Sequence, residues 1–207
     1  MNRSEVAPPV VSDKIRVVPA TPDRWDDIVT LLGGSSDKGC WCQAPRGFDV
    51  GPLRTERREL LHGQLAEDVP PGMLAYVDDE VAGWCGFGVR GSLPRLDHSR
   101  TIPAVDDRPV WAILCLNIRV GYRRRGVAQA LVEGVVDYAR KRGAPGVEAY
   151  PVDPEGGRVN TSFGFVGFTP MFERLGFRRV RMTDAHSDRR PRWLLRLDLR
   201  PAAADRG

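Results

Sequence analysis

The chain has 207 residues, a length that favours a single domain. Hydrophobic residues make up 42% and charged residues 28%, as in ordinary globular proteins, which excludes a disordered or collagen-like chain. The net charge of +4 is a mild excess, carried by 28 arginines against three lysines. Aromatic residues do not interleave with the basic runs, so we expect a scattered basic surface and no nucleic-acid binding.

The sequence also bears on where the protein works. No apolar run approaches the ~18 residues of a membrane-spanning helix, and residues 1–12 lack the apolar stretch of a signal peptide. Cys40, Cys42, Cys85 and Cys115 are too few for a disulfide framework and are typical of a reducing compartment. We therefore expect a cytoplasmic protein that does not bind membranes.

The first half of the chain predicts a strand, two helices and a hairpin. After an arm over residues 1–13, residues 15–19 alternate as a strand does. Residues 21–23, Thr-Pro-Asp, are typical of a helix start, and an apolar pattern follows them. The other elements of this half are a helix over 53–67 and a hairpin of two apolar runs, 73–77 and 81–89, joined by an acidic turn.

The second half predicts alternating strands and helices. The run 110–120 is almost continuously apolar, as expected of a central strand buried on both faces. Apolar residues then recur at helical spacing from Val127 to Tyr138. A strand over 147–152, a short helix over 169–175 and strands over 177–182 and 193–199 follow. We find no repeat and no linker, so we expect one α/β domain over 14–200 and a tail over 201–207.

The turn after the 110–120 strand is the most informative segment. Three arginines, Arg123 to Arg125, precede Gly126 and Ala128, small residues that let a backbone approach a ligand. The first N–H groups of the helix have no partner within it, and the helix dipole adds roughly half a positive charge there. The segment therefore predicts an anion site, and a diphosphate suits it better than a single carboxylate.

Two segments resemble the GNAT (GCN-type) N-acetyltransferase family. Arg123-Arg124-Arg125-Gly126-Val127-Ala128 is similar to its Q/R-x-x-G-x-G/A acetyl-CoA motif, and Phe172-Glu173-Arg174-Leu175-Gly176-Phe177 to its Y-E-K-x-G-F segment. The order of the expected elements matches the family as well. The resemblance implies an α/β fold with a mixed, splayed, predominantly antiparallel sheet of six to seven strands, flanked by about four helices.

The resemblance also implies where acetyl-CoA binds. It would lie between the strands at 110–120 and 147–152, with the thioester and pantetheine along the first strand and the pyrophosphate on the N–H groups of the turn. The expected cofactor-binding residues are Ile118, Arg119, Val120, Arg123, Arg124, Arg125, Gly126, Val127, Ala128 and Phe172. No metal is expected to take part.

The family moves acetyl from a thioester to an amine by direct attack. An amine with a pKa near ~10.4 is protonated at pH 7, so a base must take its proton, directly or through water. We expect Glu148, which lies within an apolar strand, to be that base, because burial raises the pKa of a carboxyl group. Tyr150 on the same strand face is the candidate acid, and the N–H of Ile118 is the candidate oxyanion donor. The alternatives are an exposed strand-edge acid for Glu148 and a core aromatic for Tyr150.

The chain departs from the family in its catalytic residues. Phe172 stands where the family usually has a tyrosine that protonates the departing thiolate. The stretch 111–113, Trp-Ala-Ile, lacks the glutamate of the histone-type members. A loop with the sequence Cys40-Trp41-Cys42 corresponds to the border of the family's acceptor site, and some uncharacterised bacterial members share it. Trp41 and Cys42 are therefore expected to contact the acceptor. Asp153, which follows the strand at 147–152, is a further candidate for this contact, and the alternative is that it only starts a turn.

The sequence thus favours an acetyl-CoA-dependent N-acetyltransferase, a bacterial enzyme that acetylates a primary amine of a small molecule. The alternative is a non-catalytic protein of the same fold that binds and senses acyl-CoA, which Phe172 favours. A monomer or a homodimer is expected, since the apolar strand at 193–199 could form a dimer edge.

Overall fold

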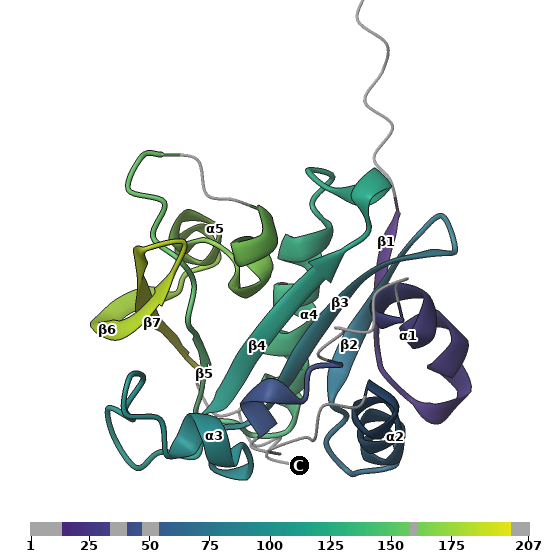
Figure 1. Cartoon of the computed structure of the whole chain (residues 1–207), viewed down its shortest axis with the longest axis horizontal. Coiled ribbons are helices and arrows are strands. Elements are labelled where there is room, and N and C mark those ends of the chain that lie inside the picture. The colour runs from purple at the N-terminus through teal and green to yellow at the C-terminus, as the bar shows by residue number, and fades with distance from the viewer. Residues whose placement is uncertain (1–13, 34–40, 47–53, 158–160, 200–207) are drawn as a thin grey trace, which may run out of the picture.

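The computed structural model describes residues 14–33, 41–46, 54–157 and 161–199. The expected arm and tail, at 1–13 and 201–207, and Cys40 lie outside these residues. Seven strands form one sheet in the order β1-β2-β3-β4-β5-β7-β6 (Figure 1). Every neighbouring pair is antiparallel except β4 and β5, which are parallel. The predicted sheet, mixed and predominantly antiparallel with six to seven strands, is confirmed.

The strands and helices follow the predicted order along the chain. Helix α3 is an addition to the prediction, because its four residues lie in a segment that has the composition of a polar loop. Strands β6 and β7 are longer than predicted, because the polar residues beside their turn remain paired. The elements are β1 (Ile15–Pro19), α1 (Trp25–Leu32), α2 (Arg54–Gln64), β2 (Gly72–Val77), β3 (Glu80–Val89), α3 (Pro94–Asp97), β4 (Trp111–Ile118), α4 (Val127–Lys141), β5 (Gly146–Ala149), α5 (Thr169–Arg174), β6 (Arg178–Ser187) and β7 (Arg190–Asp198).

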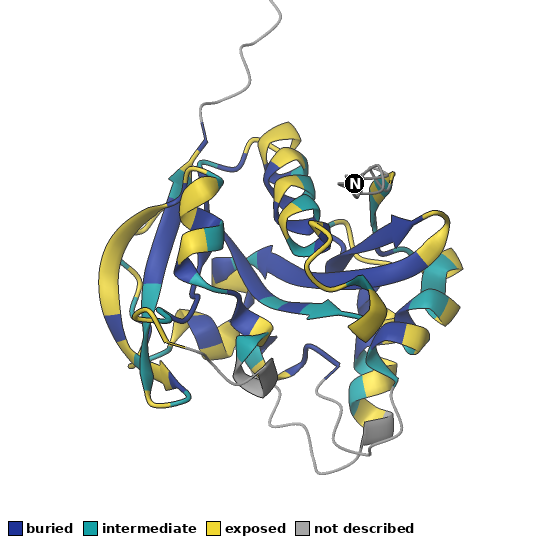
Figure 2. Ribbon diagram, turned by 90° about the horizontal axis from the view of Figure 1, so that it is seen from above, coloured by how far each residue is buried: buried dark blue, intermediate teal, exposed yellow. Residues whose placement is uncertain are grey.

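Helices cover both faces of the sheet, and each face has its own apolar core. Helix α4 crosses one face over β1 to β4, where Val127, Leu131 and Val135 join strand residues such as Trp111 and Val147. On the opposite face, α1 and α2 cover β2 and β3, and α3 with its flanking loop covers β4, β5 and β7. Figure 2 shows the buried strands between layers of helices whose outer surfaces are exposed.

Helix α4 lies unusually close to β1. A Cβ atom on Gly134 would lie only 2.6 Å from Cγ1 of Val17, so the glycine permits the contact between helix and strand. The helix has 15 residues and ends with Arg140 and Lys141, cations that suit the negative end of the helix dipole. Among the described helices, none has the length and apolar character needed to cross a membrane.

Strand β4 contains a bulge at Leu114. Cys115 is paired with Gly86 of β3 and Ile113 with Phe87, so Leu114 is the extra residue on β4. As a result Leu114 and Cys115 both point to the face opposite α4. The bulge also marks the point where β4 and β5 part, because their parallel pairing ends at Ile113 and Ala149.

Candidate functional site

Among the described residues, the outer half of β4 has no paired strand on the side of β5, where the short 3-10 helix Thr161–Val166 lies against it instead. The two strands pair at only three positions, from Trp111–Val147 to Ile113–Ala149. Beyond them the chain after β5 turns to other partners, since Val152 bridges Phe168 on one side and Arg192 on the other. In the described part of the chain, no strand pairs with residues 114–118 on this side, whereas their pairing with β3 continues.

The register of β4 directs the backbone of Ile118 to this unpaired side. The N–H of Arg119 donates to the carbonyl oxygen of Ala82 at 3.0 Å. Because successive residues of a strand direct their polar groups to opposite sides, the N–H and C=O of Ile118 point away from β3. The carbonyl accepts a hydrogen bond from Nε of Arg123 at 3.2 Å. The candidate oxyanion donor, the N–H of Ile118, therefore faces the side where β4 and β5 have separated.

The turn from β4 into α4 is built on two left-handed residues. A short 3-10 helix, Val120–Tyr122, leads to Arg124 with φ +62° and Gly126 with φ +83°. The first helical hydrogen bond is donated by the N–H of Ala130 to the carbonyl of Gly126. The N–H groups of residues 127–129 come before it and therefore have no acceptor within the helix. No side chain caps this N-terminus and its first turn has no acidic residue. These donors, with the helix dipole, leave a site suited to an anion.

The arginines of the turn have two different roles. Arg119 donates to the carbonyl of Val81 at 2.6 Å, and its guanidinium lies 5.3 Å from the centre of the Tyr122 ring. Arg125 lies over the same ring at 5.2 Å. The side chains of Arg123 to Arg125 are exposed around the helix N-terminus and bring positive charge to it. The residues predicted for the cofactor from Ile118 to Ala128 are thus gathered in one turn, while Phe172 lies elsewhere, fully buried against Phe177.

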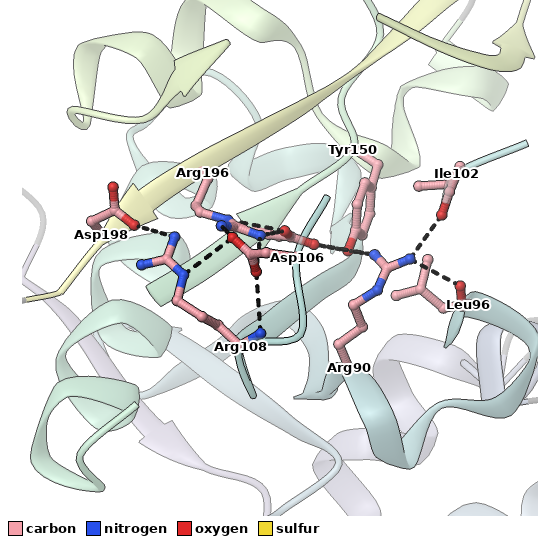
Figure 3. Close-up of polar contacts among 9 residues, drawn as sticks. Arg90, Leu96, Ile102, Asp106, Arg108, Tyr150, Arg196 and Asp198 are labelled. Carbon is pink, nitrogen blue, oxygen red and sulfur yellow. Dashed lines mark hydrogen bonds and ion pairs between the residues drawn. The ribbon is translucent and has the colours of Figure 1, made fainter. Parts of the chain in front are cut away.

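Glu148 is enclosed by hydrogen-bond donors from Arg196, Arg90 and Tyr150, which are labelled in Figure 3. Its Oε1 accepts from Nε and Nη2 of Arg196, at 3.0 and 2.6 Å. Its Oε2 accepts from Nη1 of Arg90 at 3.1 Å and from the hydroxyl of Tyr150 at 2.7 Å. A carboxylate has about four lone-pair positions, and all four are occupied here. Glu148 is completely buried, and this geometry favours a structural anchor over a base. Its role as the base stays a prediction.

Tyr150 shares the strand face of Glu148, as predicted. Its hydroxyl donates to Glu148 and accepts from Nη1 of Arg90 at 2.7 Å. Burial and the neighbouring carboxylate raise the pKa of Tyr150 well above 10, although Arg90 opposes the rise. The hydroxyl therefore keeps its proton at neutral pH, and its part in proton transfer stays a prediction.

The network continues from Glu148 to the surface through the loop after α3. Arg196 binds the carboxylate of Asp106, and Arg108 contacts Asp106 and Asp198. The hydrogen bonds from Arg196 lower the pKa of Asp106 to about 2, against a smaller opposing effect of burial. At its other end, Arg90 donates to the carbonyls of Leu96 and Ile102. The network therefore fastens the 91–108 segment to β5 and β7.

Comparison with known proteins decides the family. No curated protein matches the sequence of this chain. The family model described as the acetyltransferase (GNAT) family matches residues 41–159, more than half of the chain. The chain belongs to the GNAT acetyltransferase family.

Solved structures agree with this assignment at the level of fold. An agmatine N-acetyltransferase is 12% identical, with 90% of this chain and 100% of that chain covered and a TM-score of 0.56. The NatC complex bound to Gag peptide and CoA is 16% identical, with 90% and 99% covered and a TM-score of 0.54. The ribosomal-protein alanine N-acetyltransferase of Escherichia coli is 11% identical, with 93% and 98% covered and a TM-score of 0.51.

The residues predicted to contact the acceptor of this GNAT protein are spread over two regions. Trp41 and Cys42 lie in the core beneath α1 and α2, where Trp41 stacks on Trp25 at 5.9 Å. The sulfur of Cys42 accepts from Nε1 of Trp84 at 3.0 Å. Trp41 and Cys42 are each about 1% exposed. Their contact with an acceptor stays a prediction, and the packing supports a structural part for them.

Asp153 lies far from that loop, after β5, and is ion-paired with Arg179 at 2.5 Å. Partial burial opposes ionisation of Asp153, but the N–H of Glu155 and the guanidinium of Arg179 outweigh it and lower its pKa.

In the described part of the chain, no group of three or more His, Cys, Asp or Glu side chains could hold a metal ion.

Sequence reasoning missed the partners of Glu148. Arg90 ends an apolar strand and Arg196 interrupts another, between Leu195 and Leu197. An arginine at a buried strand position needs a carboxylate as a partner, and a buried carboxylate needs a cation. The positions of Arg90, Glu148 and Arg196 in apolar strands were therefore a signal that could have predicted their pairing.

Proposed function

We propose that this GNAT protein is an acetyl-CoA-dependent N-acetyltransferase that acetylates the primary amine of a small molecule. The uncapped N-terminus of α4, with Gly126 in the left-handed region and three exposed arginines beside it, carries the proposal. Diphosphate groups are anions of the size and charge that such a site binds. The absence of an acid from the first helical turn supports the same ligand.

The unpaired side of β4 supports the acyl-transfer step. Acetyl-CoA supplies an acetyl group activated as a thioester. Attack of a neutral amine on its carbonyl carbon forms an oxyanion, which a fixed backbone N–H stabilises without rearrangement. We assign this part to the N–H of Ile118, whose direction away from β3 follows from the register. Val120, two residues further along the chain and 79% exposed, would contact the pantetheine.

The proton of the amine needs a separate path. With its four lone pairs occupied, Glu148 supports this reaction as an anchor for Arg90 and Tyr150. The assignment of Glu148 as the base and Tyr150 as the acid, each acting through water, stays the alternative to this anchoring role. Replacing Glu148 distinguishes a base from an anchor, because an anchor changes stability more than the pH profile.

Calorimetric titration with CoA and acetyl-CoA tests the site. The variant is Gly126→Trp, whose side chain would stand at the N-terminus of α4. Gly143→Trp is the matched control, because Gly143 also has a positive φ (+73°) but lies at the other end of the same helix. We expect wild type and Gly143→Trp to bind and Gly126→Trp not to bind. Failure of folded wild type to bind either ligand would contradict the proposal.

A second function, acyl-CoA sensing without turnover, is favoured by Phe172. This residue takes the place of the family's usual tyrosine and is completely buried, so it offers no proton. An assay of CoA release over a panel of amines separates the two functions. Turnover with any primary amine supports the enzyme. Tight binding of acetyl-CoA with no turnover across the panel supports the sensor.

A further inference from the structure

Arg192 is a largely buried arginine that has no counter-charge among the described residues. Arg90 and Arg196 both contact the carboxylate of Glu148. Arg192, on β7, donates from Nε to the backbone carbonyl of Tyr150 at 2.8 Å. In the described part of the chain, no carboxylate lies within ion-pair distance of Arg192, and its two terminal nitrogens make no hydrogen bond.

Those terminal nitrogens still reach solvent. The side-chain donors that are both enclosed and without a hydrogen bond include Nε of Arg46 and Nε of Arg90, but no atom of Arg192. Arg46 also lacks a carboxylate, but it is enclosed and donates to the carbonyls of Pro71 and Phe87. Arg192 therefore combines an uncompensated charge with access from outside, and Arg46 does not.

Arg192 is placed beside the point where the sheet opens. Its bridge partner, Val152, lies on the part of the chain that has left β4, and Tyr150 is the first residue after the β4–β5 pairing. By strand alternation Arg192 shares a face with Leu194, which packs with Leu114 and Tyr150 opposite α4. The N–H of Trp193 donates to the carbonyl of Pro151, so by alternation the carbonyl of Tyr150 points away from β7, towards the side of β4. Because Nε of Arg192 donates to that carbonyl, the guanidinium crosses the chain after β5 and reaches the side where β4 and β5 have separated.

We propose that Arg192 binds a carboxylate of the acceptor, so that the acceptor is an amino acid or another compound with both an amine and a carboxylate. This inference rests on the proposed function and adds the substrate class. A guanidinium presents two parallel N–H groups that match the two oxygens of a carboxylate. A bound carboxylate would also offset the cost of burying a charge without a partner.

The electrostatics of Arg192 agree with this assignment. Burial lowers the pKa of Arg192 to about 10, and the neighbouring Tyr150 only partly opposes the shift. The site therefore disfavours its own cation when no anion is present. Arg90 faces the same tyrosine but has Glu148 as its counter-charge.

The test compares acceptors that differ by one carboxylate. Lysine is paired with cadaverine and arginine with agmatine, and CoA release gives kcat/KM for each. In wild type we expect the carboxylate-bearing member of at least one pair to be favoured about ten- to hundredfold, the range for a hydrogen bond to a charged group. In Arg192→Gln the preference should disappear, and Arg192→Lys should retain part of it. Arg181→Gln, which removes an exposed arginine from β6 of the same hairpin, should leave the preference unchanged.

The same experiment separates the inference from the proposed function. A purely structural Arg192 would lower turnover of both members of a pair alike and leave their ratio as in wild type. Equal use of both members by wild type would overturn the inference while the proposed function stands. If no amine turns over, titration of CoA-saturated protein with the same compounds decides. Carboxylate-dependent binding that Arg192→Gln loses supports the inference, and its absence overturns it.

Discussion

Nε of Arg123 donates a hydrogen bond to the carbonyl oxygen of Ile118, so the arginine that opens the anion site is tied to the last residue of β4. The bond closes the turn across five positions and fixes the strand end relative to the N-terminus of α4. It also occupies one of the two polar backbone groups that Ile118 directs to the unpaired side of β4.

Arg123→Ala should therefore weaken CoA binding. The variant loses a hydrogen bond from a charged group and one cation beside the pyrophosphate site, so we expect the Kd to rise about tenfold or more. Arg178→Ala on β6, which removes an exposed arginine far along the chain, is the control and should leave the Kd unchanged. Calorimetry measures both, and an unaltered Kd for Arg123→Ala would argue against a role for this turn.

Glu148→Gln should destabilise the fold strongly. The substitution leaves Arg90 and Arg196 in the interior without the charge they both face, a change that costs about 3–5 kcal/mol for a buried ion pair. Glu133→Gln, on the exposed side of α4, should change stability by no more than about 0.5 kcal/mol. Urea unfolding gives both values. A stable Glu148→Gln with collapsed kcat and an altered pH profile would instead identify a base.

Asp106 should make stability depend on pH in the acid range. Its pKa is about 2 in the folded protein and 3.8 ordinarily, so the unfolded chain binds more protons between these values. Stability from Asp106 is then complete above about pH 4 and is lost as the pH falls towards 2. Asp106→Asn should reduce stability at neutral pH and flatten this decline. Asp107→Asn, which changes the exposed neighbour, is the control, and urea unfolding at several pH values measures each variant. If Asp106→Asn lost stability below pH 4 as steeply as wild type, Asp106 would not be the group responsible.

Gly134→Ala tests the contact between α4 and β1. Alanine is the better helix former by about 1 kcal/mol, but its Cβ would meet Cγ1 of Val17 at 2.6 Å and Cβ of Val17 at 3.2 Å. Because rotation of Val17 does not relieve the second contact, we expect a net loss of stability. In a Val17→Ala background the same change should cost less, because only the contact with the Cβ of residue 17 at 3.2 Å remains.

Gly63→Ala on α2 provides the matched control for that prediction. A Cβ there meets no other atom within 4 Å, so the helix preference should act alone and stabilise the protein by up to about 1 kcal/mol. Thermal unfolding of the four variants measures the signs. Stabilisation by Gly134→Ala in wild type would show that the helix and strand can move apart.

The sequence predicted those parts of the fold that local patterns determine. Helix α4 was predicted closely because Val127, Leu131 and Val135 repeat at helical spacing. The four residues of α3 are too few to produce a periodic signal.

The candidate site shows the same division between local and distant information. The anion site at Gly126 is formed by consecutive residues of one turn, so a local sequence motif is enough to predict it. The surroundings of Glu148 depend on Arg90 and Arg196, which are 58 and 48 residues away. Alternation placed Glu148 on the face of Tyr150 but contained no information about those distant partners.

The bulge at Leu114 restricts how β4 can change in evolution. Before it, Trp111 and Ile113 point towards α4, and after it, Leu116 and Ile118 do so, because the extra residue shifts the alternation by one. Deletion of a single residue from this strand would reverse the faces to which the side chains point, either in the half that pairs with β5 or in the half beyond the bulge. Viable changes in the length of β4 are therefore expected to come in steps of two residues, while loops elsewhere can lengthen one residue at a time.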